Sequence, residues 1–97
     1  MTFSINCMVV NLKYSRTFSK HFEQRIQKNT MLSRAFDRRI EMFLANPEHP
    51  LLRIHPLKGS KKGFYAFSVT GDVRVLYHAT DASTVEFVDI GTHTQVY

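Results

Sequence analysis

Residues 64–79 read FYAFSVTGDVRVLYHA, two alternating apolar runs separated by a glycine and an aspartate. Alternation with a period of two is typical of β-strands, and it predicts strands at 64–70 and 73–79. A Gly-X pair suits a tight turn between antiparallel strands, so Gly71 and Asp72 predict a β-hairpin. The second half of the chain is therefore expected to be built on this hairpin.

The second strand of the hairpin has two chemically different faces, because successive side chains of a strand point to opposite sides of the sheet. One face carries Val73, Val75 and Tyr77, and the other carries Arg74, Leu76 and His78. We expect the face with the two valines to pack against helices. Arg74 should then lie on the opposite face of the sheet.

Further elements are predicted on both sides of the hairpin. Residues 84–90 alternate and predict a last strand, which follows a turn at 81–83. Residues 91–97 are expected to form a tail. Before the hairpin, residues 52–57 predict a short strand, and residues 58–63 predict a basic loop flanked by glycines.

The first half of the chain predicts one strand and two helices. Alternating apolar residues predict a strand at 3–11, with the only cysteine, Cys7, on its apolar face. Apolar residues spaced by four predict the first helix, with Ser15 or Thr17 as its N-cap. They are Phe18, Phe22 and Ile26.

A second apolar stripe predicts the second helix. Its members are Leu32, Phe36, Ile40, Phe43 and Leu44. The Asn46-Pro47 pair should end this helix, because proline disfavours a helical residue before it. The short turn at 28–30 predicts that the two helices form an antiparallel hairpin.

The order β-α-α-β-β-β predicts a single α+β domain over residues 1–97. We expect one mostly antiparallel sheet with the helical hairpin packed on one face. No stretch approaches the roughly 18 apolar residues that a membrane span needs, and the first twelve residues do not resemble a secretory signal. A lone cysteine suits a reducing compartment, so a cytoplasmic protein without a membrane partner is expected.

The net charge of +5 is unevenly distributed along the chain. Residues 13–62 carry twelve basic and four acidic residues, whereas residues 63–97 carry one basic and four acidic residues. A basic half favours a polyanion or an acidic protein as partner, although a solvated helical surface has the same composition.

Two histidines are candidates for proton transfer. His55 lies at the end of a predicted strand and His93 just after the last one, so both can reach one edge of the sheet. Imidazole accepts and donates protons near neutral pH. Arg74 can hold a phosphate, but ordinary surface histidines and an exposed strand arginine are the alternative interpretation. No His-x-x-x-His pair, cysteine pair or carboxylate cluster occurs at ligand spacing, so neither a metal nor another cofactor is expected.

Four segments in order resemble the RelE/ParE toxin superfamily, and within it the YafQ branch. They are HPLKG at 55–59, GFY at 63–65, GDVRVLY at 71–77 and GTHTQVY at 91–97. The resemblance covers residues 53–97 well, and the first half agrees in length and order of elements. It implies a RelE-like fold and a toxin that cleaves messenger RNA in the ribosomal A site and is silenced by a cognate antitoxin, here expected to be acidic.

The resemblance also implies roles for individual residues. His55 and His93 fall on the two catalytic histidines of the YafQ branch, Asp72 on its functional aspartate and Tyr97 on its C-terminal aromatic residue. A third histidine of that branch aligns with Ser68, which is a departure from the pattern. Arg74 on the next strand occupies a place where RelE-type members use a basic residue.

The mechanism expected from these residues is metal-independent attack of the RNA 2′-hydroxyl on the neighbouring phosphate. His93 is the expected general acid and His55 or Asp72 the base, with the roles open to exchange. Arg74 should stabilise the phosphorane charge and Tyr97 should stack on a base. Lys58, Lys61 and Lys62 are expected to bind the RNA backbone.

Two other functions remain open at this point. The first is a ParE-like toxin, which has the same fold but poisons DNA gyrase by binding. The second is a non-toxic basic module that binds RNA or protein and whose histidines do not lie together. Asp72 can equally be interpreted as a turn residue without a catalytic role. The alternative interpretation of Tyr97 is a frayed terminal residue. The positions of His55, Arg74 and His93 in space distinguish these possibilities.

Overall fold

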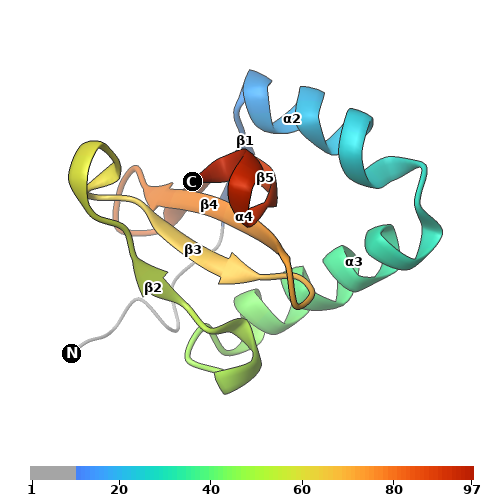
Figure 1. Ribbon diagram of the computed structural model, residues 1–97. Helices are drawn as coiled ribbons and strands as arrows, with labels where there is room; N and C mark the ends of the chain where they lie inside the picture. The colour runs from blue at the N-terminus through green and yellow to red at the C-terminus, as the bar shows by residue number, and fades with distance from the viewer. Residues whose placement is uncertain (1–10) are drawn as a thin grey trace.

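The structure is a computed structural model that describes residues 11–97. Its strands form one five-stranded sheet in the order β1-β5-β4-β3-β2 (Figure 1). The strands are β1 (Asn11–Tyr14), β2 (His55–Pro56), β3 (Tyr65–Ser68), β4 (Val73–Ala79) and β5 (Thr84–Thr92). Among these strands only β1 and β5 pair in parallel, and the other neighbours are antiparallel. The predicted α+β class and mostly antiparallel sheet are confirmed.

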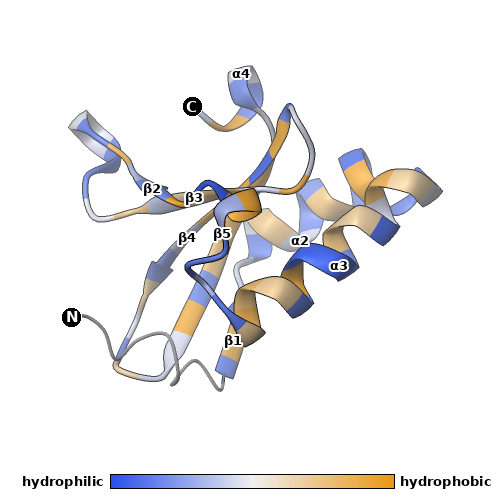
Figure 2. Ribbon diagram, turned by 90° about the horizontal axis from the view of Figure 1, so that it is seen from below, coloured by the Kyte–Doolittle hydropathy of each residue, from blue (hydrophilic) through white to orange (hydrophobic). Residues whose placement is uncertain are grey.

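Two helical segments pack on one side of this sheet (Figures 1 and 2). The first is α2 (Arg16–Phe22), which continues into the π-helical turn η1 (Glu23–Gln27), and the second is α3 (Thr30–Ala45). Ser15 caps α2 by accepting a hydrogen bond from the amide of Phe18 at 2.9 Å. Of the two predicted caps, the structure therefore uses Ser15. Asn29 caps α3 in the same way, and α3 ends at Ala45, directly before Asn46, as predicted.

The core between helices and sheet is largely aromatic. Phe43 of α3 packs on Phe67 and Tyr77 with ring centroids 5.1 Å apart in both pairs. Phe87 of β5 is fully buried beside them. Val73, Val75 and Tyr77 belong to this core, as the alternation predicts.

A second, smaller core lies on the opposite face of the sheet. Leu76 and Ala66 are buried there beneath Val96 of α4 (His93–Val96). The prediction of a tail over 91–97 is therefore wrong, because β5 runs to Thr92 and a helical turn follows. Burial of Val96 on the sheet stabilises this turn, which is too short to persist alone.

Two predicted strands are shorter in the structure than expected. The strand expected at 52–57 is reduced to β2, because Pro50–Leu52 forms the 3-10 turn η2 and Arg53 has a φ of 50°. The strand expected at 64–70 is β3, because the amides of Val69 and Thr70 both donate to the carbonyl of Val73 and begin the turn there. The basic loop contains a further 3-10 turn, η3 (Gly59–Lys61).

A β-bulge interrupts the pairing of β4 with β5. Leu76 pairs with Asp89 and Tyr77 with Phe87, so Val88 is an extra residue in β5. Ser15 holds this irregularity, since its amide donates to the carbonyl of Phe87 and its hydroxyl to that of Val88, both at 3.0 Å. The start of α2 is thereby attached to the middle of β5.

The strand predicted at 3–11 and Cys7 lie outside the described residues, apart from Asn11, which begins β1. Within residues 11–97, no helix is both long and apolar enough to cross a membrane.

Candidate active site

Tyr97 is the residue around which the predicted site residues collect. Its hydroxyl lies 2.8 Å from Nε2 of His55. The ring of His93 packs nearly edge-on against the ring of Tyr97, with the ring centroids 4.3 Å apart and the ring planes at 71°. The guanidinium carbon of Arg74 lies 6.0 Å from the centroid of the same ring. Residues from β2, β4 and α4 thus converge on one side chain.

The backbone selects one tautomer of the neutral His55 ring. Its Nδ1 lies 2.9 Å from the carbonyl oxygen of Arg53, which can only accept a hydrogen bond. Nδ1 therefore carries the proton, and Nε2 of the neutral ring accepts the hydrogen bond of the Tyr97 hydroxyl. Arg53 presents its carbonyl from a left-handed backbone conformation, which L-residues adopt rarely. The hydrogen bond between His55 and the Arg53 carbonyl cannot be predicted from the position of the histidine in the sequence.

Arg74 is held at the site by the turn that precedes β4. It donates from Nη1 to the carbonyl of Asp72 at 2.9 Å, and the same nitrogen lies 4.0 Å from Oδ1 of Asp72. The Asp72 side chain is 70% exposed, so its carboxylate lies at the rim of the site. A guanidinium has five donor hydrogens in a planar fork, so this contact leaves most of them for an anion.

The helical turn α4 brings His93 and Tyr97 together. Thr92 caps the turn through a capping box with Gln95, and the amide of Tyr97 donates to the carbonyl of His93 at 3.0 Å. Both side chains are exposed, as an incoming ligand requires. In this fold Tyr97 is thus held against His55 and His93 by α4.

Burial raises the pKa of the Tyr97 hydroxyl, and the neighbouring charge of Arg74 acts in the opposite direction. Because the net shift is upward, the phenol stays protonated at neutral pH. It is then a hydrogen-bond donor, which agrees with its bond to the unprotonated Nε2 of His55.

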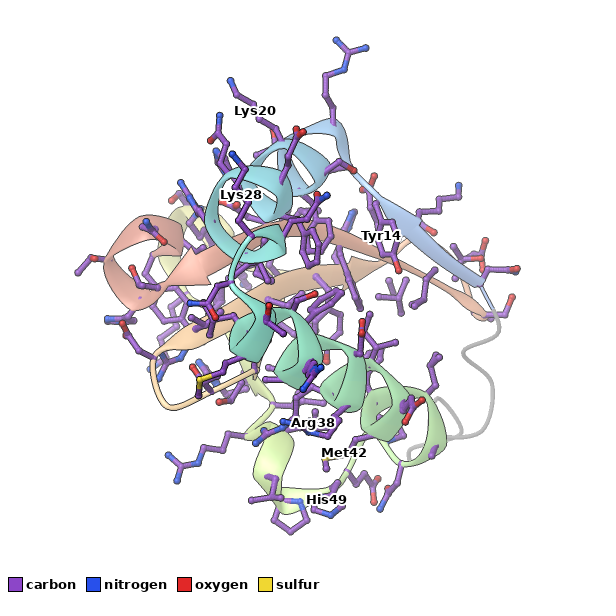
Figure 3. The ribbon with its side chains drawn as sticks, turned by 90° about the vertical axis from the view of Figure 1, so that its right-hand side faces the viewer. Tyr14, Lys20, Lys28, Arg38, Met42 and His49 are labelled. Atoms are coloured by element: carbon purple, nitrogen blue, oxygen red, sulfur yellow. The ribbon has the colours of Figure 1, made fainter. Side chains whose placement is uncertain are left out.

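The predicted lysines lie beside this cluster on the loop that contains η3. Lys58 and Lys61 line a shallow hollow together with Leu57, Ser60 and Tyr97. Lys62 belongs to the same loop and is exposed. Basic residues also occupy the helix side of the molecule, where Lys20, Lys28 and Arg38 lie on α2, after η1 and on α3 (Figure 3).

The remaining histidines have partners elsewhere. His21 lies 2.6 Å from Asp89, and His78 lies 2.9 Å from Glu86 while Phe64 stacks flat on its ring. His49 accepts a hydrogen bond from the amide of Leu51, and Ser68 is buried in β3. Across residues 11–97, no three His, Cys, Asp or Glu side chains are grouped so that they could hold a metal ion.

The sequence matches, over residues 10–97, a family described as the bacterial toxin of type II toxin–antitoxin systems, YafQ. The chain belongs to the YafQ toxin family. The family's place among type II systems makes the chain a toxin of that class, as the four sequence segments suggested. No curated protein sequence matches the chain.

Solved structures agree with membership of the YafQ family. YafQ from E. coli strain BL21(DE3) is 26% identical and superposes with a TM-score of 0.75, covering 90% of this chain and 97% of that one. The E. coli DinJ–YafQ toxin–antitoxin complex gives 25% identity and a TM-score of 0.74, with coverage of 93% and 99%. The YoeB/ParE toxin from Agrobacterium tumefaciens has the same fold at 18% identity and a TM-score of 0.72, with coverage of 87% and 99%.

Proposed function

We propose that this YafQ-family toxin is an endoribonuclease that cuts messenger RNA on the ribosome with histidine acid–base chemistry and without a metal. The observation that carries the proposal is the convergence of His55, His93 and Arg74 on Tyr97. A protein that acts by binding alone has no need of two imidazoles beside a phosphate-binding cation. The cytoplasm, where ribosomes translate, is the expected place of action.

In the proposed reaction, His55 is the general base. Its Nε2 takes the proton of the RNA 2′-hydroxyl, whose oxygen then attacks the adjacent phosphorus. The hydrogen bond from Tyr97 occupies this nitrogen in the free protein, so the bound nucleotide displaces the phenol. The ring of Tyr97 is then free to stack on a base beside the cut.

His93 is the proposed general acid. The bond between phosphorus and the 5′-oxygen breaks as His93 gives its proton to that oxygen, leaving a 2′,3′-cyclic phosphate and a 5′-hydroxyl. Arg74 stabilises the negative charge that develops on the phosphoryl oxygens. The backbone carbonyl of Asp72 holds Arg74, while the exposed Asp72 carboxylate lies 4.0 Å from the same nitrogen at the rim of the site, which favours His55 as the base.

Lys58, Lys61 and Lys62 are proposed to bind the RNA backbone beside the reacting phosphate, because two of them share a hollow with Tyr97. An acidic antitoxin is the proposed protein partner. The E. coli YafQ structure with its antitoxin DinJ supports this, as does the net charge of +5.

The test is induced expression in bacteria of the wild type beside His93→Ala and His49→Ala, with primer extension on a translated message. His49 lies outside the cluster and serves as the matched control. We expect growth arrest with new in-frame cuts in the wild type and in His49→Ala, and neither in His93→Ala. Arrest without cuts, equally strong in His93→Ala, would overturn the nuclease and point to gyrase as the target.

A further inference from the structure

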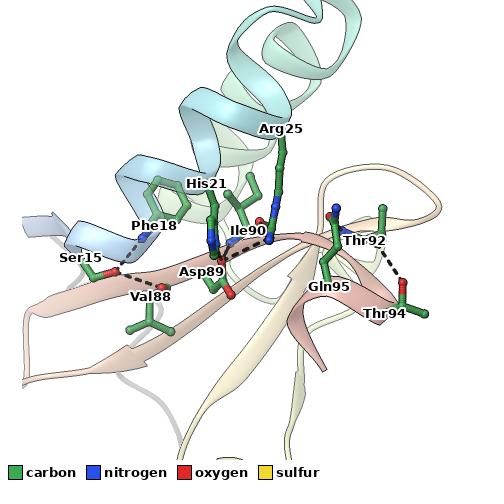
Figure 4. A network of polar contacts seen from close by, with 10 residues as sticks. All are labelled: Ser15, Phe18, His21, Arg25, Val88, Asp89, Ile90, Thr92, Thr94 and Gln95. Carbon is green, nitrogen blue, oxygen red and sulfur yellow. Dashed lines mark hydrogen bonds and ion pairs between the residues drawn. The ribbon is translucent and has the colours of Figure 1, made fainter.

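A set of side chains outside the proposed site connects the helical hairpin to the strand that carries α4. His21 of α2 and Arg25 of η1 both reach β5, as Figure 4 shows. Nδ1 of His21 lies 2.6 Å from Oδ1 of Asp89, and Nη1 of Arg25 lies 3.7 Å from the same oxygen. Arg25 also donates to the carbonyl of Ile90 at 2.8 Å. These contacts hold β5 at the two residues before Gly91.

Gly91 is buried between Arg25 and α4. A Cβ atom at this position would lie 2.6 Å from Nη1 of Arg25 and 2.6 Å from Oε1 of Gln95. The absence of a side chain therefore lets the guanidinium and the Gln95 amide approach the same stretch of backbone. The φ of Gly91 is outside the left-handed region, so close approach, and not backbone conformation, requires glycine here.

Gln95 carries the connection into the site. Its Oε1 accepts a hydrogen bond from the amide of Thr92 at 2.8 Å, which closes the capping box of α4. The turn has only four residues, so its orientation depends on such contacts and on Val96. His93 begins this turn, and Tyr97 follows directly after it.

We infer that His21, Arg25, Asp89 and Gly91 form a clamp on β5 that positions α4, and with it His93 and Tyr97, for reaction. The four act through β5 and Gln95, so they are positioning residues and not catalytic residues. The expected effect of the clamp on cleavage rests on the proposed function. The effect of the clamp on the placement of α4 does not depend on that function.

The clamp can be perturbed without altering the proposed catalytic groups. Gly91→Ala forces Arg25 or Gln95 away from the backbone. Its control is Gly71→Ala, because a methyl group at Gly71 would have no neighbour within 4 Å and the φ of Gly71 is not positive. Arg25→Ala removes the clamp's cation, and its control is Lys28→Ala, which removes an exposed positive charge from the adjacent turn. Arg25→Lys keeps the charge beside Asp89 but loses the planar fork.

Two measurements are made on these proteins. The first is kcat and KM for cleavage of a short message on programmed ribosomes, at a temperature where circular dichroism shows every variant folded. The second is the NMR shift of the His93 ring protons, which report the Tyr97 ring 4.3 Å away. Gly91→Ala and Arg25→Ala should lower kcat by about 10- to 100-fold, because a displacement of about 1 Å can cost that much. KM should change little, since the lysine loop is intact, and Arg25→Lys should be intermediate.

The expected result is a fall in kcat together with moved His93 shifts in Gly91→Ala and Arg25→Ala, while Gly71→Ala and Lys28→Ala match the wild type. Unmoved His93 shifts in both clamp variants would overturn the inference, whatever happens to kcat. Moved shifts with an unchanged kcat would overturn the catalytic importance of the placement. If the wild type cleaves no RNA, the proposed function fails, and the shifts alone still decide whether the clamp positions α4. If Arg25→Ala does not fold, Gly91→Ala and Arg25→Lys provide the same comparison.

Discussion

The side chains of His55 and Tyr97 share a hydrogen bond of 2.8 Å although 42 residues separate them in the chain. The bond joins the short strand β2 to the end of α4, so it closes the site from two directions. In the free protein it keeps the proposed base covered by the residue proposed to stack on the substrate. The proposed order of events, in which a nucleotide displaces the phenol before proton transfer, depends on this arrangement.

Tyr97→Phe tests whether the ring or the hydroxyl of this residue matters. The variant keeps the aromatic surface and loses the hydrogen bond that covers Nε2 of His55 in the free protein. Because the nucleotide has to displace this bond, which contributes about 0.5 to 1.5 kcal/mol net, the cleavage rate should stay the same or rise by at most about tenfold. Tyr97→Ala should instead lose activity, because base stacking contributes about 1 to 3 kcal/mol. Single-turnover cleavage on ribosomes gives both rates. Equal inactivity of the two variants would show that the hydroxyl itself takes part in the chemistry.

Replacing Lys58, Lys61 and Lys62 together by glutamine should weaken RNA binding in a salt-dependent manner. Each phosphate contact to single-stranded RNA contributes about 0.7 to the slope of log affinity against log salt concentration, so three contacts contribute about 2. Fluorescence anisotropy with a short RNA over a salt series measures this slope. Lys20→Gln with Lys28→Gln serves as a control on the helix side. A slope that is the same in all three proteins would remove these lysines from the RNA-binding surface.

Val96→Ala should affect activity more than stability. Val96 is buried against Leu76 and Ala66 and attaches α4 to the sheet, and losing two methyl groups costs about 1 to 2 kcal/mol. Urea unfolding should show this modest decrease, while cleavage should fall by an order of magnitude or more, since both His93 and Tyr97 move with the turn. Val73→Ala, a comparable deletion in the core under the helices, supplies the reference. A loss of activity no larger in Val96→Ala than in Val73→Ala would contradict this account of α4.

The stability of the fold should decrease at high pH because of Tyr77. Burial, with a smaller contribution from the charge of Tyr65, raises the pKa of the Tyr77 hydroxyl well above its ordinary value of 10.0. Below pH 10 the phenol is protonated in both states, but above it the unfolded chain releases its proton first, so the free energy of unfolding falls as pH rises. The decrease from this group approaches about 1.4 kcal/mol per pH unit.

Urea unfolding of the wild type and of Tyr77→Phe between about pH 9 and 11 isolates this contribution. The two curves of free energy against pH should diverge above the ordinary pKa of 10.0, with Tyr77→Phe decreasing less steeply. Parallel curves would show that Tyr77 ionises as readily in the fold as in the unfolded chain.

Much of the fold follows from periodicity because local patterns report burial directly. The alternation over 73–79 separates Val75 from Arg74 correctly, and the stripe ending before Asn46 marks the end of α3. The hydrophobic pattern does not predict α4, because this four-residue turn is stabilised by packing of Val96 on residues of the sheet that are distant in sequence. It also cannot report the bulge at Val88, which depends on Ser15, 73 residues away.

The candidate site was predictable in its residues but not in its geometry. His55, Arg74, His93 and Tyr97 were identified from sequence segments, and in the structure the first three meet around the fourth. That Nδ1 of His55 is bonded to the carbonyl of Arg53 depends on a left-handed residue that no motif marks. The clamp on β5 is not predictable from the sequence for a related reason, because His21 and Asp89 are 68 residues apart and neither belongs to a recognisable motif.

The parallel pairing of β1 with β5 has a consequence for a chain that is still being synthesised. In the sheet order, β5 lies between β1 and β4, so the last of the described strands to leave the ribosome joins β1 to the rest of the sheet. Until Thr84–Thr92 has emerged, β1 and β4 have no neighbour in common, the aromatic core lacks Phe87, and α4 has not been made. The cluster around Tyr97 therefore forms only after both β5 and α4 have been synthesised, so the proposed cleavage cannot precede them.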